Sequence, residues 1–179
     1  PRKEEAAYLS ALCYYEGSLQ YNLDQSNTES AITELQNFLN EYPDSERSKN
    51  ITQLVDELTY KLEFKAFENA RQYYNMGEYK AATVAFENVL EDFPATKLRP
   101  KIYDIIMKSK YELALNSIYD LKKERLDAAA SYAKRVSAEL PNSEYSKTAD
   151  DLYAKLEDEK VKFAVLQADF EKRKAEYEA

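Results

Sequence analysis

The segment YNMGEYKAATVAFENVLEDFP, from Tyr74 to Pro94, decides the fold class of this chain. It has a glycine near its start, small residues in its middle and a proline at its end. Two other phrases, FLNEYPDS and VSAELPNS, close in the same way at Pro43 and Pro141. The three prolines lie 51 and 47 residues apart. A period in this range is typical of a helical repeat array.

Small or apolar residues stand twelve, eight and five positions before each proline, and these spacings place side chains on one face of a helix. We therefore expect three short B helices, over about 28–41, 79–92 and 126–139. Each should end before its proline, because proline disfavours helix in the preceding residue. The residues concerned are Ala31, Leu35 and Phe38; Ala82, Phe86 and Val89; and Ala129, Ala133 and Val136.

Longer A helices are predicted between these phrases. The chain from 45 to 76 contains no Gly or Pro, enough for a helix of about 30 residues that stops at Gly77. A second long helix is expected from 97 to about 122, with Glu124 standing where Gly77 does. The hydroxyl residues two positions after each proline are cap candidates for the helices that follow: Ser45, Thr96 and Ser143.

The C-terminal segment, about 143–179, contains no helix breaker. Apolar residues recur in it every seven positions, at Leu156, Phe163, Phe170 and Tyr177. We expect its first part to pack on the array and its last turns to project. Glu159 and Arg173 interrupt the stripe, so both a coiled coil and a plain capping helix remain open.

The first unit has a longer connection, QYNLDQSNTES. Ser26 and Glu29 in it have capping-box spacing. The insertion is either a plain surface loop or a partner-binding one, since both insertion and function concentrate in loops. Its candidate partner-binding residues are Asp24, Gln25, Asn27 and Thr28.

Composition excludes several classes of function. The formal net charge of −8 argues against nucleic acid and against binding of the domain body to anionic lipid. The chain has no His, which removes Ser-His and Cys-His catalysis and His metal ligands. Its two glycines cannot build a phosphate loop, and its acidic clusters are typical of solvated helix faces. We therefore predict no catalytic residue, no cofactor and no metal.

Together these patterns predict an all-α, tetratricopeptide-like α-α superhelix (solenoid) with long A helices and a long C-terminal helix. We expect a single domain over 1–179, with units of about 1–43, 44–94 and 95–141. The second unit resembles the tetratricopeptide pattern of small, aromatic and glycine positions: Ala70, Tyr73, Gly77, Tyr79, Ala82, Phe86, Val89 and Pro94.

The phrases LDQSNTESAITELQNFLNEYPDSER and KAFENARQYYNMGEYKAATVAFENVLEDFP extend this likeness. With long A helices and YPDS-type ends, the chain up to about Tyr153 resembles the YfiO (BamD) family of outer-membrane assembly lipoproteins, in its forms with an extended first loop. The resemblance implies a non-enzymatic periplasmic scaffold of the β-barrel assembly machinery. It also implies binding to the barrel-forming subunit and to unfolded outer-membrane proteins.

The family is anchored to the periplasmic face of the outer membrane of Gram-negative bacteria by a lipidated N-terminal Cys. This sequence shows no signal peptide and begins at Pro1, so we expect a fragment whose membrane attachment depends on an anchor outside it. Cys13 superficially resembles a lipobox cysteine, but Leu12 stands where a small residue is required. We interpret Cys13 as a buried helix cysteine.

A partner groove is predicted on the A helix before Gly77. Four residues, Phe67, Arg71, Tyr74 and Asn75, should fall on the face away from Ala70 and Tyr73. In such a groove Asn75 would hold the backbone of an extended segment and Arg71 a carboxylate. The alternative function is another tetratricopeptide adaptor, a periplasmic cell-envelope coordinator or a soluble co-chaperone, that binds extended peptides.

Overall fold

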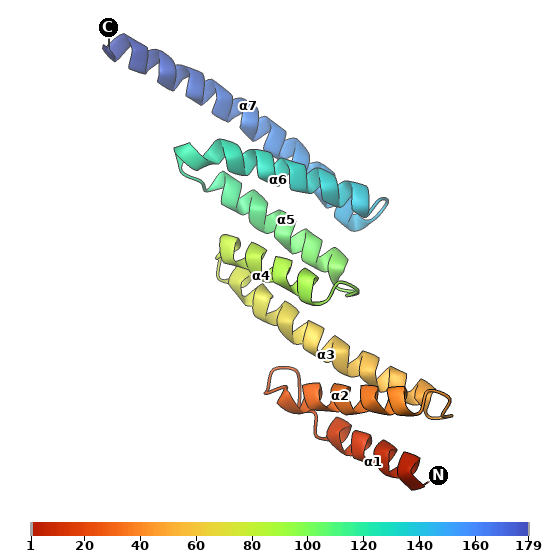
Figure 1. Ribbon diagram of the computed structural model, residues 1–179. Coiled ribbons are helices and arrows are strands. Elements are labelled where there is room, and N and C mark those ends of the chain that lie inside the picture. The colour runs from red at the N-terminus through yellow and green to blue at the C-terminus, as the bar shows by residue number, and fades with distance from the viewer. Residues whose placement is uncertain (1, 179) are drawn as a thin grey trace. The chain divides into compact units, whose positions relative to one another are not determined.

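The computed structural model describes residues 2–178. That part of the chain forms α-helices joined by short connections and contains no strand (Figure 1). The all-α, helix-repeat class predicted from the sequence is confirmed. The helices are α1 (Arg2–Glu16), α2 (Ser26–Glu41), α3 (Ser48–Asn75), α4 (Tyr79–Asp92), α5 (Arg99–Leu115), α6 (Tyr119–Glu139) and α7 (Glu144–Glu178).

The chain divides into two compact units, unit 1 over 1–69 and unit 2 over 70–179. In unit 1, α1, α2 and the first turns of α3 enclose a core that contains Leu35, Phe38 and Leu58. In unit 2, α4 packs on α5, α5 on α6, and α6 on α7. The prediction of one solenoid domain over the whole chain stays a prediction.

The apolar face predicted for the three B helices is confirmed. All nine residues, from Ala31 in α2 to Val136 in α6, are buried. Burial of apolar surface contributes about 25 cal/mol per Å², so these faces supply much of the driving force for pairing each helix with its neighbours.

Gly77 ends α3 as predicted, in the left-handed conformation with φ of +77°. The Gly77 amide donates to the carbonyl oxygen of Tyr74, and the Glu78 amide to that of Tyr73, over 3.0 and 2.9 Å. This pair of bonds is the Schellman pattern, which satisfies carbonyls that a helix end otherwise leaves without donors. α4 then begins at Tyr79, where the sequence predicts it.

The boundary predicted in the third unit is wrong. α5 ends at Leu115 rather than about 122, and α6 begins at Tyr119 rather than 126. Counting back from a proline assumes helices of equal length, but α6 has 21 residues against 14 in α4. The seven extra residues add about two turns, so Glu124 lies inside a helix and not in a turn. The Asn116 amide group donates to the carbonyl oxygen of Glu112 over 2.9 Å and helps to close α5 without glycine.

The predicted caps divide into two kinds. Ser143 directly precedes α7, and its Oγ accepts the Ser146 amide over 3.1 Å, as expected of an N-cap. Ser45 and Thr96 stand three residues before α3 and α5, so their hydroxyl oxygens stabilise the preceding turns instead.

The capping box predicted for Ser26 and Glu29 does not form. The Ser26 amide and hydroxyl both donate to the Asp24 carboxylate, over 3.2 and 3.1 Å. Gln25 is the N-cap residue of α2, and the chain turns before it so that the carboxylate of the preceding residue reaches the first amide of the helix. Asp24 therefore takes the place that the pattern assigns to Ser26.

Cys13 is helical, as predicted, but its side chain is exposed, so the prediction of burial is wrong. Among the described residues of α1, only Ala11 is buried. Cys13 therefore lies on the solvent-exposed side of α1. A helix at the end of a packed unit needs only a narrow apolar stripe.

The C-terminal helix follows the sequence prediction. Leu156 and Phe163 are buried against α5 and α6, whereas no residue of α7 from 164 to 177 is buried. The Tyr119 ring at the start of α6 contacts both Phe163 and Phe170, with centroids 5.3 and 5.4 Å apart. The seven-residue stripe is thus half core and half surface.

Candidate protein-docking surfaces

The long connection between α1 and α2 is held by a buried glutamine. The Gln25 amide nitrogen donates to three backbone carbonyls of the loop, those of Gln20, Leu23 and Asp24, over 2.7, 3.0 and 3.2 Å. The Gln25 side chain is buried. A buried donor that serves several carbonyls stabilises one loop conformation, because each unpaired group would carry a desolvation penalty.

A second set of bonds joins the loop to α3. The Thr28 hydroxyl, which is fully buried, donates to the Gln25 side-chain oxygen over 2.8 Å and shares a 2.6 Å bond with the Ser18 hydroxyl. Lys61 donates to Ser18 over 2.8 Å, and Lys65 donates to the Leu23 carbonyl over 2.5 Å. Residues 42 and 43 positions apart thus fasten the loop on both sides.

The four loop residues selected from the sequence are engaged within the chain. Gln25 and Thr28 point inward, Asp24 caps α2, and the Asn27 amide group donates to the Gly17 carbonyl over 3.2 Å. These contacts give them a clear structural role. Their role in partner binding stays a prediction.

Sequence reasoning missed the apolar residues that this network presents to solvent. Leu19, Tyr21 and Leu23 from the loop and Tyr60 from α3 are 38–48% exposed. The Tyr21 ring stands edge-on to Phe64 at 4.8 Å, and Tyr60 stacks on Phe64 at 6.1 Å. We call these five residues the loop platform. The signal was the alternation of apolar residues in the otherwise polar stretch LQYNL.

The α3 residues selected for a groove do not share one environment. Phe67 is 6% exposed and stacks on Phe64, so its placement on a face away from Ala70 is wrong: both are buried. Tyr73, expected to pack, is 43% exposed. Arg71 and Asn75 are exposed. A helix that has neighbours on more than one side buries a wider arc than a single stripe predicts.

Tyr74 is half-buried, and its ring meets the Tyr79 ring edge-on at 5.8 Å. Burial raises the pKa of the Tyr74 hydroxyl, and the nearby Lys108 charge partly opposes that rise. This residue therefore has a packing role at the junction of α3 and α4. Its predicted role in partner binding, like those of Arg71 and Asn75, stays a prediction.

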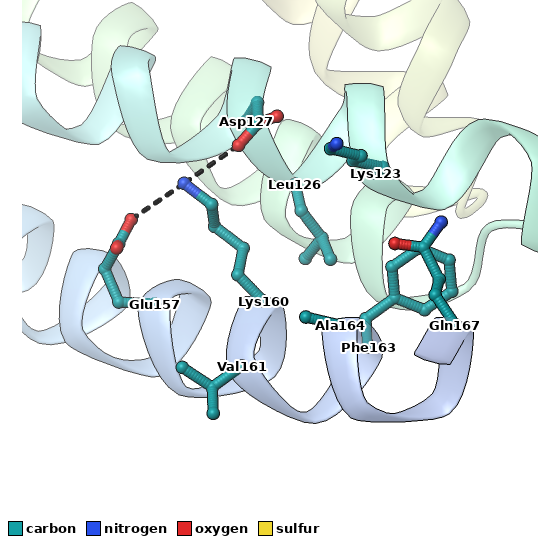
Figure 2. A pocket seen from close by; sticks show the side chains of 9 residues that line it. All are labelled: Lys123, Leu126, Asp127, Glu157, Lys160, Val161, Phe163, Ala164 and Gln167. Carbon is teal, nitrogen blue, oxygen red and sulfur yellow. Dashed lines mark hydrogen bonds and ion pairs between the residues drawn. The ribbon is translucent and has the colours of Figure 1, made fainter. Parts of the chain in front are cut away.

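A hollow of about 310 Å³ lies between α6 and α7 (Figure 2). Leu126 points into it from α6, while Phe163, Ala164 and Gln167 come from α7. Val161 lies at its edge, is 66% exposed and points away from α6. The size and apolar lining suit one bulky apolar side chain of a partner.

The rim of this hollow carries paired charges. Lys160 lies between Asp127 and Glu157, with nitrogen–oxygen distances of 2.8 and 3.1 Å (Figure 2). The bonds to Asp127 and Glu157 raise the pKa of the Lys160 ammonium group, which stays charged at neutral pH. Exposed pairs of this kind orient a partner more than they stabilise the fold.

These surfaces combine apolar side chains with charged ones. Within residues 2–178, no group of three or more acidic or Cys side chains is arranged to hold a metal ion. The same residues include no helix of the length and apolarity that crossing a membrane requires. The surfaces offer apolar contacts with charged edges, as protein interfaces do.

Comparisons with known proteins agree with this description. The sequence model of the YfiO family, described as an outer membrane lipoprotein, matches residues 1–125. A curated relative, outer membrane protein assembly factor BamD of Caulobacter vibrioides, is 28% identical over 116 residues. That alignment covers 65% of this chain and 38% of the relative, so the matched part spans well under half of that protein's length.

Proposed function

The chain belongs to the YfiO family of outer membrane lipoproteins, and from that premise we propose that it is a non-enzymatic scaffold in outer-membrane protein assembly. In this role it binds the barrel-forming subunit of the assembly machinery at the periplasmic face of the outer membrane. A lipid anchor outside this sequence holds it at the membrane. The similarity to a Caulobacter outer membrane protein assembly factor supports this role.

The observation that carries the proposal is the hollow between α6 and α7. A partner side chain inserted there would contact Leu126 and Phe163 and would no longer be exposed to water. Fully desolvated side chains in pockets of this kind make the strongest contacts of an interface. The Lys160 pairs at the rim would be shielded from water by the partner. Exposed apolar residues of α7, including Val161 and Phe170, enlarge the contact area on either side.

The position of the hollow on packed helices supports protein binding over catalysis. Leu126 and Phe163 belong to one core cluster with Ala114, Ala129 and Leu156, so the floor of the hollow is rigid. A rigid surface loses little conformational entropy when a partner binds. Unfolded outer-membrane protein segments are the second proposed ligand, with Arg71 and Asn75 of α3 as exposed polar contacts.

The proposal is tested by site-specific photo-crosslinking in the bacterial envelope. The full-length protein carries a photoreactive amino acid at Val161, beside the hollow. The matched control carries it at Glu91, which is exposed at the end of α4. We expect position 161 to crosslink to the barrel-forming subunit and position 91 not to do so.

Two results would overturn the proposal. One is a full-length protein that purifies without the barrel-forming subunit and forms no crosslink to it from either position. The other is a crosslink from position 161 to an envelope-division protein or a chaperone, which would support the alternative adaptor function.

A further inference from the structure

We propose that the loop platform of unit 1 is a docking site for a polypeptide segment of net positive charge that carries aliphatic or aromatic side chains. The site consists of Leu19, Tyr21, Leu23, Tyr60 and Phe64. It belongs to unit 1, whereas the hollow between α6 and α7 belongs to unit 2. The inference goes beyond the proposed function, because it names another surface and a different chemistry of partner.

The platform is formed before any partner arrives. Lys61 donates to Ser18, the Ser18 and Thr28 hydroxyls are hydrogen-bonded, and Thr28 donates to the Gln25 side chain. Gln25 in turn holds three loop carbonyls, including that of Leu23. This continuous set of bonds fixes the backbone that presents Leu19, Tyr21 and Leu23. Preorganised contacts retain more of their binding energy than mobile ones.

The exposed side chains are of the kind that dominates protein interfaces. Tyr21 and Tyr60 present ring faces and hydroxyls, and Leu19 and Leu23 lie two positions before and after Tyr21 in the sequence. Scattered single apolar residues on a surface need no explanation, but three within five loop residues form a group. Tyr side chains supply large contact areas at small entropic cost.

Charge decides which partner fits. Residues 1–69 carry 13 acidic and six basic side chains, whereas residues 70–179 carry 20 and 19. The excess of negative charge therefore belongs to unit 1, with a formal net charge of −7. On α3, Asp56, Glu57 and Glu63 lie within about one turn of Tyr60. A cationic segment would be drawn to such a surface and held in register by it.

The two lysines nearest the platform keep their positive charges and offset part of this field, but unit 1 still carries a formal net charge of −7. Lys61 and Lys65 are both committed to the loop, through Ser18 and the Leu23 carbonyl. A second copy of unit 1 would carry the same formal net charge of −7 and would be repelled, as would an anionic lipid surface. A cationic polypeptide is the occupant that both the charge and the apolar groups favour.

The inference is tested by peptide binding to the full-length protein, measured by fluorescence anisotropy. The probe is a labelled 12-residue peptide that alternates Lys with Leu and Tyr. One comparison peptide replaces every Lys by Glu, and another replaces every Leu and Tyr by Ser. We expect the Lys and Leu/Tyr peptide to bind at least tenfold more tightly than either comparison peptide. Its affinity should fall between 50 and 500 mM salt.

Two variants locate the binding. Leu19→Ser with Leu23→Ser should weaken binding of the probe at least tenfold. Val84→Ser with Ile118→Ser, which changes exposed residues of unit 2, should alter it less than twofold. A photoreactive amino acid at Leu19, but not at Val84, should crosslink to the probe, and this readout does not depend on the serine variants folding.

The inference is overturned if the acidic or the serine peptide binds as tightly as the probe. Equal losses from the two double variants, or crosslinking from position 84 and not from 19, would also overturn it. Self-association of the protein through position 19 would identify a second copy as the occupant instead. None of these results depends on the crosslink at position 161, so the two proposals fail independently.

Discussion

The Glu78 amide donates a hydrogen bond to the Tyr73 carbonyl oxygen over 2.9 Å, and this contact closes α3 around a single left-handed residue. The bond is possible because Gly77 adopts a φ of +77°, which L-residues with a side chain rarely adopt. A Cβ at this position would have no neighbour within 4 Å, so its cost would be conformational and not steric crowding.

The variant Gly77→Ala should therefore lower the free energy of unfolding by about 1–2 kcal/mol, the cost of placing a side chain in the left-handed region. Urea unfolding followed by circular dichroism measures this change. Gly17→Ala is the matched control, because Gly17 has no positive φ and a Cβ there meets atoms at 3.4 Å or more. An equal loss in both variants would contradict the assignment to Gly77 geometry.

Removing the Gln25 side chain should loosen the loop. In Gln25→Ala, three carbonyls lose their donor and Thr28 loses its acceptor, at a cost of about 1–3 kcal/mol. Urea unfolding measures the cost, and amide hydrogen exchange over 18–25 should accelerate. Gln20→Ala removes an exposed side chain and leaves the carbonyl acceptor, so stability there should stay within about 0.5 kcal/mol of the parent.

The two aromatics of the α7 stripe should differ in their contribution to stability. Phe163 is 5% exposed and Phe170 is 52% exposed, although they are the same residue type seven positions apart. Phe163→Ala should cost about 3–5 kcal/mol, as for a buried Phe. Phe170→Ala should cost less than about 1 kcal/mol. Thermal unfolding of the two variants compares them directly, and similar losses would show that the last turns of α7 are packed.

Stability should be nearly constant from pH 6 to 9 and fall above pH 10. The chain has no His to titrate near neutrality. Burial raises the pKa of Tyr15, Tyr74 and Tyr132 above its ordinary value near 10. Above pH 10 the unfolded chain loses tyrosine protons that the folded chain keeps, so unfolding becomes more favourable as pH rises. Below pH 10 the tyrosines are protonated in both the folded and the unfolded chain, so the stability that this effect contributes is fully present there.

Tyr132→Phe isolates one of these groups. The Tyr132 hydroxyl has no hydrogen-bond partner among residues 2–178, and the Arg135 guanidinium lies over the ring and not over the hydroxyl. Removal of the hydroxyl should therefore change stability at pH 7 by less than about 1 kcal/mol. Above pH 10 the variant should lose stability less steeply than the parent. Tyr177→Phe, at a site almost fully exposed, should not alter the slope. Equal slopes in all three proteins would contradict the role of burial at Tyr132.

Much of the fold was predictable because it depends on sequence patterns that extend over only a few residues. Apolar spacing marked the buried faces of α2 and α4, and Gly77 marked the end of α3. Helix periodicity and the conformational freedom of glycine act over a few residues, so they need no knowledge of distant parts of the chain. The boundary between α5 and α6 was missed because no short sequence pattern indicates that α6 is about two turns longer than the corresponding helix α4.

The candidate sites were less predictable, since they depend on contacts between distant residues. Asp24, Gln25, Asn27 and Thr28 were selected as contacts for a partner, yet Gln25 and Thr28 are buried supports of the loop.

Local patterning thus sufficed for the helix class and for the buried faces of α2 and α4. The three-dimensional packing was needed to show that Lys61 and Lys65 hold a loop that lies 43 and 42 residues earlier in the chain. The same packing leaves Leu19, Tyr21 and Leu23 exposed to solvent. Which side of a helix or loop meets water depends on the neighbours it acquires on folding, and those neighbours come from elsewhere in the chain.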